Sequence, residues 1–179
     1  MSRNDRLKAW AQNVVARHER EIANLVGVKE VPPIEIHVER NGTAAAWTNG
    51  TDVFLNARWF AEHADDVGGV VHELTHAIMR APVYDDSTRW LIEGIADYVR
   101  DALGHDAPWT RAHFSPGNAL AGYQETAHFL LWLEPRHPGT VRALARDLMQ
   151  GTYERGSFET ATGAPQDVLV SEYEVEQQG

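Results

Sequence analysis

The chain has 179 residues, of which 43 % are hydrophobic and 23 % are charged, values that are ordinary for a folded globular protein and exclude disorder. It contains no cysteine, which excludes a disulfide scaffold and leaves His, Asp and Glu as the side chains able to hold a transition metal. The formal net charge of −10 repels phosphate backbones and anionic bilayers, so we expect neither nucleic acid nor a membrane as a partner.

The N-terminal segment 1–30 is predicted to be helical. Apolar residues recur at helical spacing from residue 5 to residue 26, the pattern of an amphipathic helix. The segment lacks the uninterrupted apolar core of a signal peptide, which favours a cytoplasmic location. A secreted protein whose leader had been removed would look the same.

The segment 31–56 is predicted to form strands. It opens with an apolar–polar alternation over 34–39, typical of a half-buried strand. Two Asn-Gly pairs follow, at Asn41 and Asn49, and this dipeptide suits tight hairpin turns. With the segments 43–48 and 51–56, these turns predict three short antiparallel strands in a meander.

Helical periods replace the alternation over 57–173. Capping and breaking residues predict helices at 57–63, 65–80, 86–103, 115–134, 140–150 and 165–173. The polar tail 174–179 is expected to fray. Several aromatic residues are expected in the core or a pocket wall: Trp59, Trp109, Trp132, Phe114, Phe129 and Phe158. A sheet followed by helices, without a linker or repeat, predicts one α+β domain over 1–179.

The strongest chemical signal is the sequence His-Glu-Leu-Thr-His at residues 72–76. Two histidines four residues apart lie on one face of a helix, so the imidazoles of His72 and His76 can reach a single ion. Glu73 lies between them, where it can meet a water molecule held by that ion. The pattern therefore predicts a catalytic metal site.

Glu93 and Asp97 are expected to complete this site. A catalytic zinc site uses three protein ligands and leaves the fourth position to water. Glu93 follows His76 after sixteen residues, enough for a turn and a returning helix, and is the expected third ligand. Asp97 lies one helical turn later, where it can accept the second N–H of a ligand histidine. The alternative, a solvated acidic helix face, is disfavoured by the apolar residues around both carboxylates.

These motifs resemble those of the gluzincin metallopeptidases, the class that includes thermolysin and the zinc aminopeptidases. The sequence is more similar to the plant-type basic secretory protein family of peptidases, over roughly residues 34–173. The stretches that match in order are 46–50, 71–76, 91–99 and 122–130. The chain departs from that family in its acidic charge and in lacking a secretion signal, which leaves its location and substrate open.

The resemblance implies a zincin-like fold and a zinc-dependent hydrolase of peptide bonds with one Zn²⁺ per chain. By this resemblance, His72, His76 and Glu93 bind the ion. Glu73 acts as the general base that takes a proton from water and passes it to the leaving amine.

A second donor to the developing oxyanion is also expected. Tyr123, which lies in the matching Gly-Tyr segment, is the first candidate, and Tyr98 and His128 follow it.

The substrate is expected to lie along an edge strand. In related folds an antiparallel edge beside the active helix pairs with the peptide backbone. The candidate segment is 43–47, and the expected substrate contacts are Ala45, Ala46 and Trp47. An equally weighted alternative is that the alanines pack under the first helix.

Three functions remain open from the sequence. The first is a zinc metallopeptidase acting on peptides or proteins, an endopeptidase rather than an aminopeptidase because no motif for a free N-terminus is evident. The second is a non-catalytic metal-binding regulatory protein, which the presence of Glu73 disfavours. The third is a zinc hydrolase acting on a small metabolite. The sequence does not determine the oligomeric state.

Overall fold

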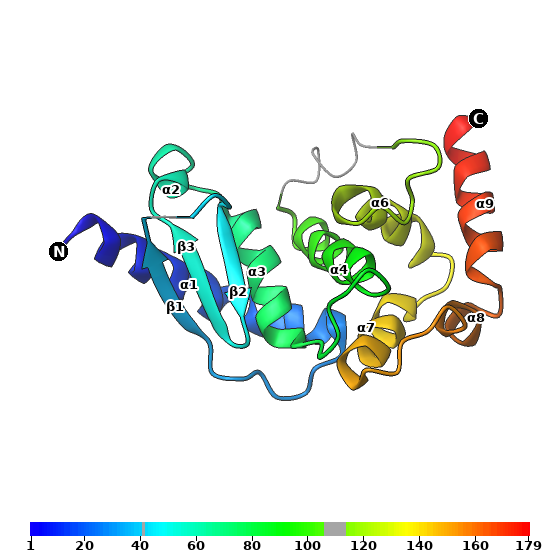
Figure 1. The fold of residues 1–179 in the computed structure, drawn as a ribbon, viewed down its shortest axis with the longest axis horizontal. Coiled ribbons are helices and arrows are strands. Elements are labelled where there is room, and N and C mark those ends of the chain that lie inside the picture. The colour runs from blue at the N-terminus through cyan, green and yellow to red at the C-terminus, as the bar shows by residue number, and fades with distance from the viewer. Residues whose placement is uncertain (41, 106–113) are drawn as a thin grey trace.

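A computed structural model describes residues 1–40, 42–105 and 114–179 (Figure 1). It confirms the predicted α+β class: a small sheet packs with helices that continue to the C-terminal end of the chain. The described elements are, in order, α1 (Arg3–Val26), β1 (Glu35–Glu39), β2 (Ala46–Asn49), β3 (Asp52–Asn56), α2 (Trp59–Glu62), α3 (Val67–Met79), α4 (Arg89–Ala102), α6 (Tyr123–Leu133), α7 (Thr140–Gln150), α8 (Ser157–Thr162) and α9 (Gln166–Gln178). None of the helices in these described ranges is long and apolar enough to cross a bilayer.

The described strands form a mixed sheet, so the predicted antiparallel meander is wrong. Their order is β1–β3–β2, with β1 parallel to β3 and β2 antiparallel to it. Only the second Asn-Gly pair makes a hairpin, in which Gly50 takes a positive φ of 61° directly after β2 ends. The first pair does not join neighbouring strands, and Asn41 itself lies outside the described residues.

The reason for this strand order is burial. Val53 and Leu55 of β3 are both fully buried, whereas β2 has no fully buried residue and Trp47 on it is 40 % exposed. The most apolar strand therefore takes the central position, and β2 becomes an edge of the described sheet. Alternation in the sequence specifies which face of a strand is buried, but it does not specify the strand's neighbours.

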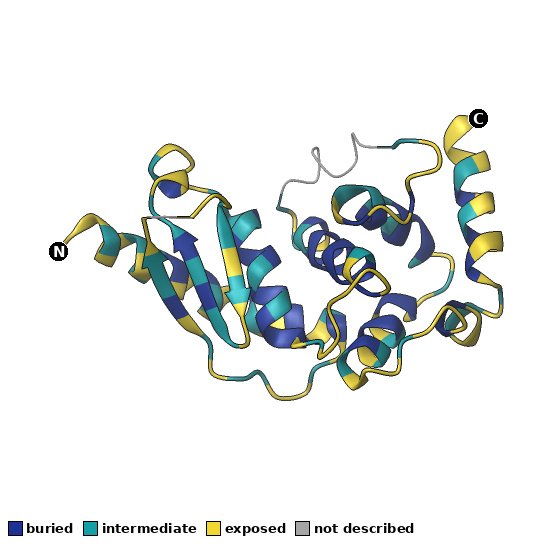
Figure 2. Ribbon diagram, in the orientation of Figure 1, coloured by how far each residue is buried: buried dark blue, intermediate teal, exposed yellow. Residues whose placement is uncertain are grey.

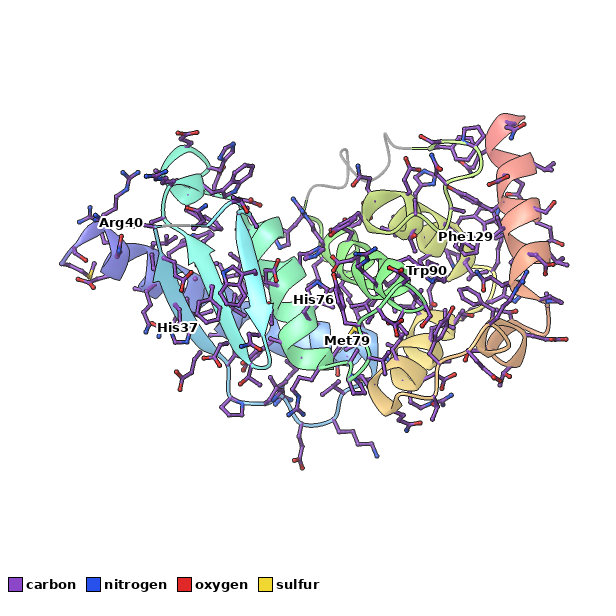
Figure 3. All side chains as sticks on the ribbon, in the orientation of Figure 1. His37, Arg40, His76, Met79, Trp90 and Phe129 are labelled. Carbon is purple, nitrogen blue, oxygen red and sulfur yellow. The ribbon has the colours of Figure 1, made fainter. Side chains whose placement is uncertain are left out.

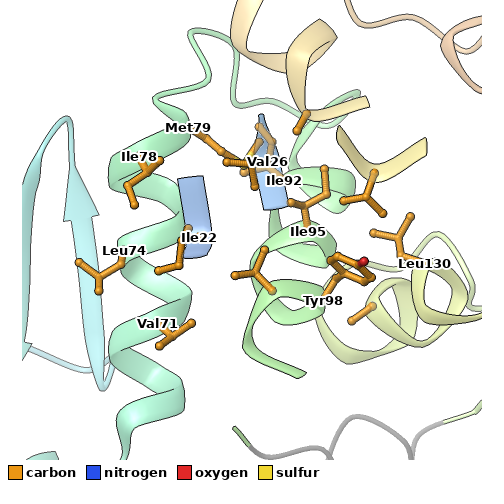
Figure 4. Close-up of a cluster of buried hydrophobic side chains, with 14 of the residues drawn as sticks. Ile22, Val26, Val71, Leu74, Ile78, Met79, Ile92, Ile95, Tyr98 and Leu130 are labelled. Atoms are coloured by element: carbon orange, nitrogen blue, oxygen red, sulfur yellow. The ribbon is translucent and has the colours of Figure 1, made fainter. Parts of the chain in front are cut away.

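One part of the core lies between the sheet and the helices α1, α3 and α4, and the same buried cluster continues into α6, α7, α8 and α9. Figure 4 shows Leu74 and Ile78 of α3 on the side of the strands, and Ile92 and Ile95 of α4 across from them. All four side chains are at most 3 % exposed, and Ile22 of α1 is fully buried in the same cluster. Figure 2 shows the buried residues following α3, α4 and the central strand. Helix α3 is thus fixed between the sheet and α4.

Helices α4 and α6 approach closely where α4 carries Gly94. A Cβ atom built on Gly94 would overlap the Cγ2 methyl of Thr126 on α6. The absence of a side chain at Gly94 is therefore what allows this contact, at the cost of lower helix propensity. Because α4 also carries Glu93 and Asp97, the contact sets the position of both carboxylates.

Replacing Gly94 by Ala is expected to destabilise the protein by about 1–3 kcal/mol through overpacking. The double variant Gly94→Ala with Thr126→Ser should recover only a small part of this loss, because Ser removes the Cγ2 methyl group but keeps the Thr126 Cβ, which lies 2.5 Å from the added Cβ. Ser also keeps the hydroxyl, which donates to the Ala119 carbonyl and accepts from the Gly122 N–H, both at 2.9 Å. Urea unfolding of the wild type and both variants is the measurement, and a Gly94→Ala variant as stable as the wild type would show that the contact is not tight.

The helical half differs from the prediction at three places, the first of which is α8 (Ser157–Thr162), a short helix that was not predicted. Helix α6 begins at Tyr123 and not at residue 115, since the preceding segment turns at Gly117 and Gly122, both with positive φ. The last helix, α9, does not fray at residue 174 but continues to Gln178. Its extension is held by Glu174, which accepts from the Gly117 N–H, and by Glu176, which accepts from Trp132 Nε1. These long-range contacts leave no local signal in the sequence.

The aromatic residues divide between core and surface. Phe129 and Phe158 are fully buried, and Trp132 is buried as predicted. Trp59 is instead 38 % exposed, where its ring stacks on His63. Phe114 packs against the core from a partly buried position, and Trp109 lies outside the described residues.

Candidate metal centre

Two helices carry the predicted ligands. Helix α3 begins after Asp66, whose side chain accepts from the Gly69 N–H at 2.7 Å and so caps the helix. His72 and His76 then lie one turn apart, on the side of α3 that faces α4. Figure 3 shows His76 on this side. Helices α3 and α4 pack against each other, which brings Glu93 to the two histidines.

The donor atoms of the three residues converge. The Nε2 atom of His72 lies 3.0 Å from Nε2 of His76 and 3.0 Å from Oε2 of Glu93. The third separation, from His76 Nε2 to Glu93 Oε2, is 3.5 Å. A tetrahedral zinc ion with bonds of about 2.0–2.1 Å separates its ligand atoms by about 3.3 Å. These residues therefore form a group that could hold a metal ion, with spacings that fit zinc.

Asp97 lies behind His72, at the position expected for a residue that orients the imidazole. Its Oδ1 atom is 2.7 Å from Nδ1 of His72, and the residue is 1 % exposed. A proton on Nδ1 donated to Asp97 leaves the Nε2 lone pair directed at the other donor atoms. The sequence placed Asp97 here from helical spacing alone.

The electrostatics of the group follow from these contacts. Burial opposes a charge on His72, but its hydrogen bonds to Asp97 and Glu93 outweigh burial and raise its pKa to about 10. Burial likewise opposes the Glu93 carboxylate, and its bonds to His72 and His76 outweigh that effect and lower the pKa of Glu93 well below its usual range. The carboxylates around His72 thus favour a positive charge at this place, which a proton supplies when no ion is bound and a metal cation can supply instead.

Glu73 is held by the edge strand β2. The hydroxyl of Thr48 lies 2.7 Å from Oε2 of Glu73 and 3.1 Å from its backbone carbonyl. A hydroxyl carries one proton, which it donates to one of these oxygens at a time. Thr48 therefore fixes one carboxylate oxygen of Glu73 beside the histidines. The sequence analysis missed Thr48, because no local pattern joins it to α3.

Tyr84 is a second residue that the sequence analysis missed. Its hydroxyl donates to Oε1 of Glu93 at 2.5 Å, so that the two oxygens of Glu93 have different partners. Burial and this bond to Glu93 raise the pKa of Tyr84 and keep the phenol protonated. Tyr84 lies in the connection between α3 and α4, which carries no helical or strand periodicity. No signal in the sequence links it to Glu93.

Of the three candidate oxyanion donors, Tyr123 is the one that lies beside His72 in the metal group. Its ring is stacked on that of His72, with ring centroids 6.2 Å apart and planes 8° apart, and the residue is 50 % exposed. Partial burial and the nearby Glu93 carboxylate raise the pKa of Tyr123. Tyr98 is buried in the core, and His128 is hydrogen-bonded to Tyr173 on α9.

A cleft of about 620 Å³ opens over this group. It is lined by Ala44, Ala46, Trp47, Thr48, Gly50, His72, Glu73, His76, Met79, Arg80, Ala81, Tyr84, Ile92, Glu93 and Tyr123. Figure 3 shows Met79 below His76 on α3. The cleft thus combines the candidate ligands, Glu73 and Tyr123 with residues of the edge strand.

The predicted substrate segment is only partly in the cleft. Ala46 and Trp47 line it, whereas Ala45 does not. Ala45 directly precedes β2, and its carbonyl accepts from the Asn56 N–H of β3 at 3.0 Å. By strand alternation, Ala46 and Thr48 then direct their N–H and C=O groups away from β3. Ala46 also packs against the core, where β2 contacts α3.

Comparison with known proteins gives one family. The family model described as peptidase of plants and bacteria matches residues 4–173. The match begins in α1 and ends in α9, so it includes the cleft and every residue of the metal group. No curated protein and no solved structure matches the chain.

Proposed function

The chain belongs to the family of peptidases of plants and bacteria, and from this premise we propose that it is a zinc-dependent metallopeptidase. The observation that carries the proposal is the convergence of two imidazole nitrogens and one carboxylate oxygen, 3.0–3.5 Å apart, beside Glu73 in an open cleft. Two imidazoles and one carboxylate suit zinc, one ion per chain. His72, His76 and Glu93 would hold it.

The other roles in the proposed reaction, proton transfer and positioning, are assigned to residues of the chain. A bound zinc ion supplies a Lewis acid that acidifies water and polarises the scissile carbonyl. Glu73 accepts the proton of the attacking water and passes it to the leaving amine, so that no net proton is consumed. The hydrogen bond from Thr48 fixes one oxygen of Glu73, which leaves the other oxygen to accept the proton. Asp97 holds the His72 ring in the orientation that binds the ion.

Tyr123 is proposed to donate a hydrogen bond to the oxyanion that develops on the scissile carbonyl. Replacing it by Phe removes that donor and keeps the ring stacked on His72. We expect kcat to fall by about 10²–10³-fold, the usual loss for one oxyanion donor, with the zinc content unchanged. Steady-state kinetics together with metal analysis measure both quantities. A variant with normal kcat would exclude Tyr123 from the reaction.

Tyr84 is proposed to position Glu93. Its hydroxyl donates a hydrogen bond to Oε1 of Glu93, and Oε2 of the same carboxylate remains to bind the ion. Replacing Tyr84 by Phe should weaken zinc binding about tenfold, the lower end of what residues behind a metal ligand contribute, because Tyr84 is 55 % exposed. Competition with a chelator measures the affinity, and Tyr123→Phe serves as the matched control. Equal affinities of the two variants would contradict this role.

The substrate is proposed to be an extended peptide that lies along β2. Ala46 and Thr48 offer outward backbone groups at the edge of the sheet, the arrangement by which an added strand is bound. Trp47 lines the cleft beside them. A peptide bound through its backbone along an edge strand needs no free terminus, which favours an endopeptidase.

Metal removal and restoration test the proposal. The protein as isolated is expected to cleave a mixed peptide library, to lose cleavage after dialysis against a chelator, and to regain it with one equivalent of Zn²⁺. Cleavage that persists without metal would overturn zinc dependence. Zinc binding without cleavage of any peptide would instead favour a hydrolase of small metabolites or a regulatory protein.

A further inference from the structure

Arg80 brings a positive charge to one end of the cleft. It directly follows α3, and it is the only arginine or lysine among the described residues that line the cleft. Helix α3 and strand β2 run in the same direction, so the turn at Gly50 and Arg80 lie toward the same end (Figure 1). The site therefore has an arginine beyond its metal group, at the end where the β2–β3 turn lies.

Arg80 has no carboxylate partner among the described residues. In the part of the chain that the structure describes, no carboxylate lies within 4.0 Å of the Arg80 guanidinium. Several other described arginines also form no ion pair with a described residue, so it is the position of Arg80 in the cleft that distinguishes it. The Arg80 side chain is exposed and therefore available to a ligand.

The backbone at Arg80 is a second, independent observation. Arg80 has φ of 47° and ψ of 47°, the left-handed conformation that usually selects glycine or asparagine at a helix end. Among the described residues, the non-glycine residues with positive φ are Arg80 and Tyr123, and both line this cleft. Strained residues of this kind cluster at functional sites. A glycine at position 80 would remove the strain, so the backbone conformation alone does not account for an arginine at this position.

A structural explanation competes with this one. A cation at the C-terminal end of a helix interacts favourably with the helix dipole. That interaction would be served equally by arginine or lysine at any position of the last turn, and it does not require a left-handed residue in the cleft. The two explanations differ in one respect: a dipole effect is independent of the charge of the substrate.

We propose that Arg80 is a specificity-determining residue that binds a carboxylate of the peptide substrate. The proposal rests on the proposed peptidase function and adds the chemical class of the group bound at one end of the cleft. Glu73 and Glu93 are the carboxylates among the described residues that line the cleft, and a divalent ion would balance their two negative charges. Asp97, behind His72, lies 3.9 Å from the Arg100 guanidinium. With an ion bound and the imidazoles neutral, Arg80 is the charge left unbalanced on the cleft lining, and it attracts an anion. The guanidinium binds a carboxylate through two parallel hydrogen bonds. The carboxylate is either an acidic side chain or the C-terminus of the peptide.

The test compares peptides that differ only in charge. Each peptide carries Glu, Gln or Lys at a scanned position near the cleaved bond, and each is made with a free or an amidated C-terminus. The zinc-loaded wild type is compared with Arg80→Asn, which tolerates the left-handed backbone, and with Arg80→Glu. The control is Arg20→Glu, the same charge change at an exposed position of α1 that does not line the cleft. The readouts are kcat/KM and, in a Glu73→Gln background, peptide affinity by calorimetry.

We expect the wild type to prefer one anionic peptide over its neutral counterpart by about tenfold, the effect of a charged hydrogen bond discounted for exposure. Arg80→Asn should abolish the preference, Arg80→Glu should reverse it toward Lys, and Arg20→Glu should leave it intact. A preference that follows the Glu–Gln exchange identifies a side chain, and one that follows amidation identifies the C-terminus.

Two results separate this inference from the proposed function. If the Arg80 variants change the cleavage and binding of all peptides by one factor, or if the wild type shows no charge preference, the inference is wrong and the peptidase function stands. If no peptide is cleaved but calorimetry shows an anion preference that depends on Arg80, the peptidase function is wrong and the anion site stands.

Discussion

Replacing Glu73 by Gln is expected to lower kcat/KM for peptide cleavage by a factor of about 10²–10⁴, the usual contribution of a general base. Gln has the same shape, and its amide oxygen can still accept the hydrogen bond from Thr48, so the geometry beside α3 is retained. The amide cannot take a proton from water. Because Glu73 is not one of the converging donors, the zinc content should stay at about one per chain.

Kinetics with a peptide from the library and metal analysis of the same samples measure the two effects separately. The matched control is Glu62→Gln on α2, an exposed carboxylate that does not line the cleft. Equal cleavage by wild type and Glu73→Gln would remove Glu73 from the mechanism. Loss of zinc from Glu73→Gln would show that this carboxylate is itself a ligand.

Replacing Glu93 by Ala has the second large effect, because it removes the only carboxylate among the three converging donors. We expect zinc affinity to fall by more than about hundredfold, beyond the 10–100-fold loss typical of a residue behind a ligand. Asp97→Ala removes a residue behind a ligand, so it is expected to show that smaller loss of zinc affinity and serves as the comparison. Peptide cleavage at limiting zinc should fall with the affinity in both variants.

Because Glu93 is 5 % exposed and its replacement leaves two buried histidines without their carboxylate, folding must be measured in parallel. Glu93→Gln keeps the volume of the side chain and offers a neutral, weaker ligand, so it separates a loss of zinc from a loss of structure. Chelator competition and thermal unfolding of both variants are the measurements. Unchanged zinc affinity in a folded Glu93 variant would show that the third ligand lies elsewhere.

The edge strand and the loop before α4 show what could not be predicted locally. Thr48 reaches Glu73 across 25 residues of sequence, and Tyr84 reaches Glu93 from a segment without periodicity. Both contacts exist only because the sheet and α4 pack on opposite sides of α3. The same packing leaves Ala45, directly before β2, outside the cleft lining, although sequence analysis grouped it with Ala46 and Trp47 as a substrate contact.

Features that repeat within one helix could be predicted from the sequence alone. The four-residue spacings of His72 with His76 and of Glu93 with Asp97 place each pair on one helix face, because 3.6 residues make a turn. The strand order, the partners of Glu73 and Glu93, and the left-handed arginine at the end of the cleft were decided by tertiary structure. These depend on which buried surfaces meet, and burial is a property of the whole chain, not of any segment of it.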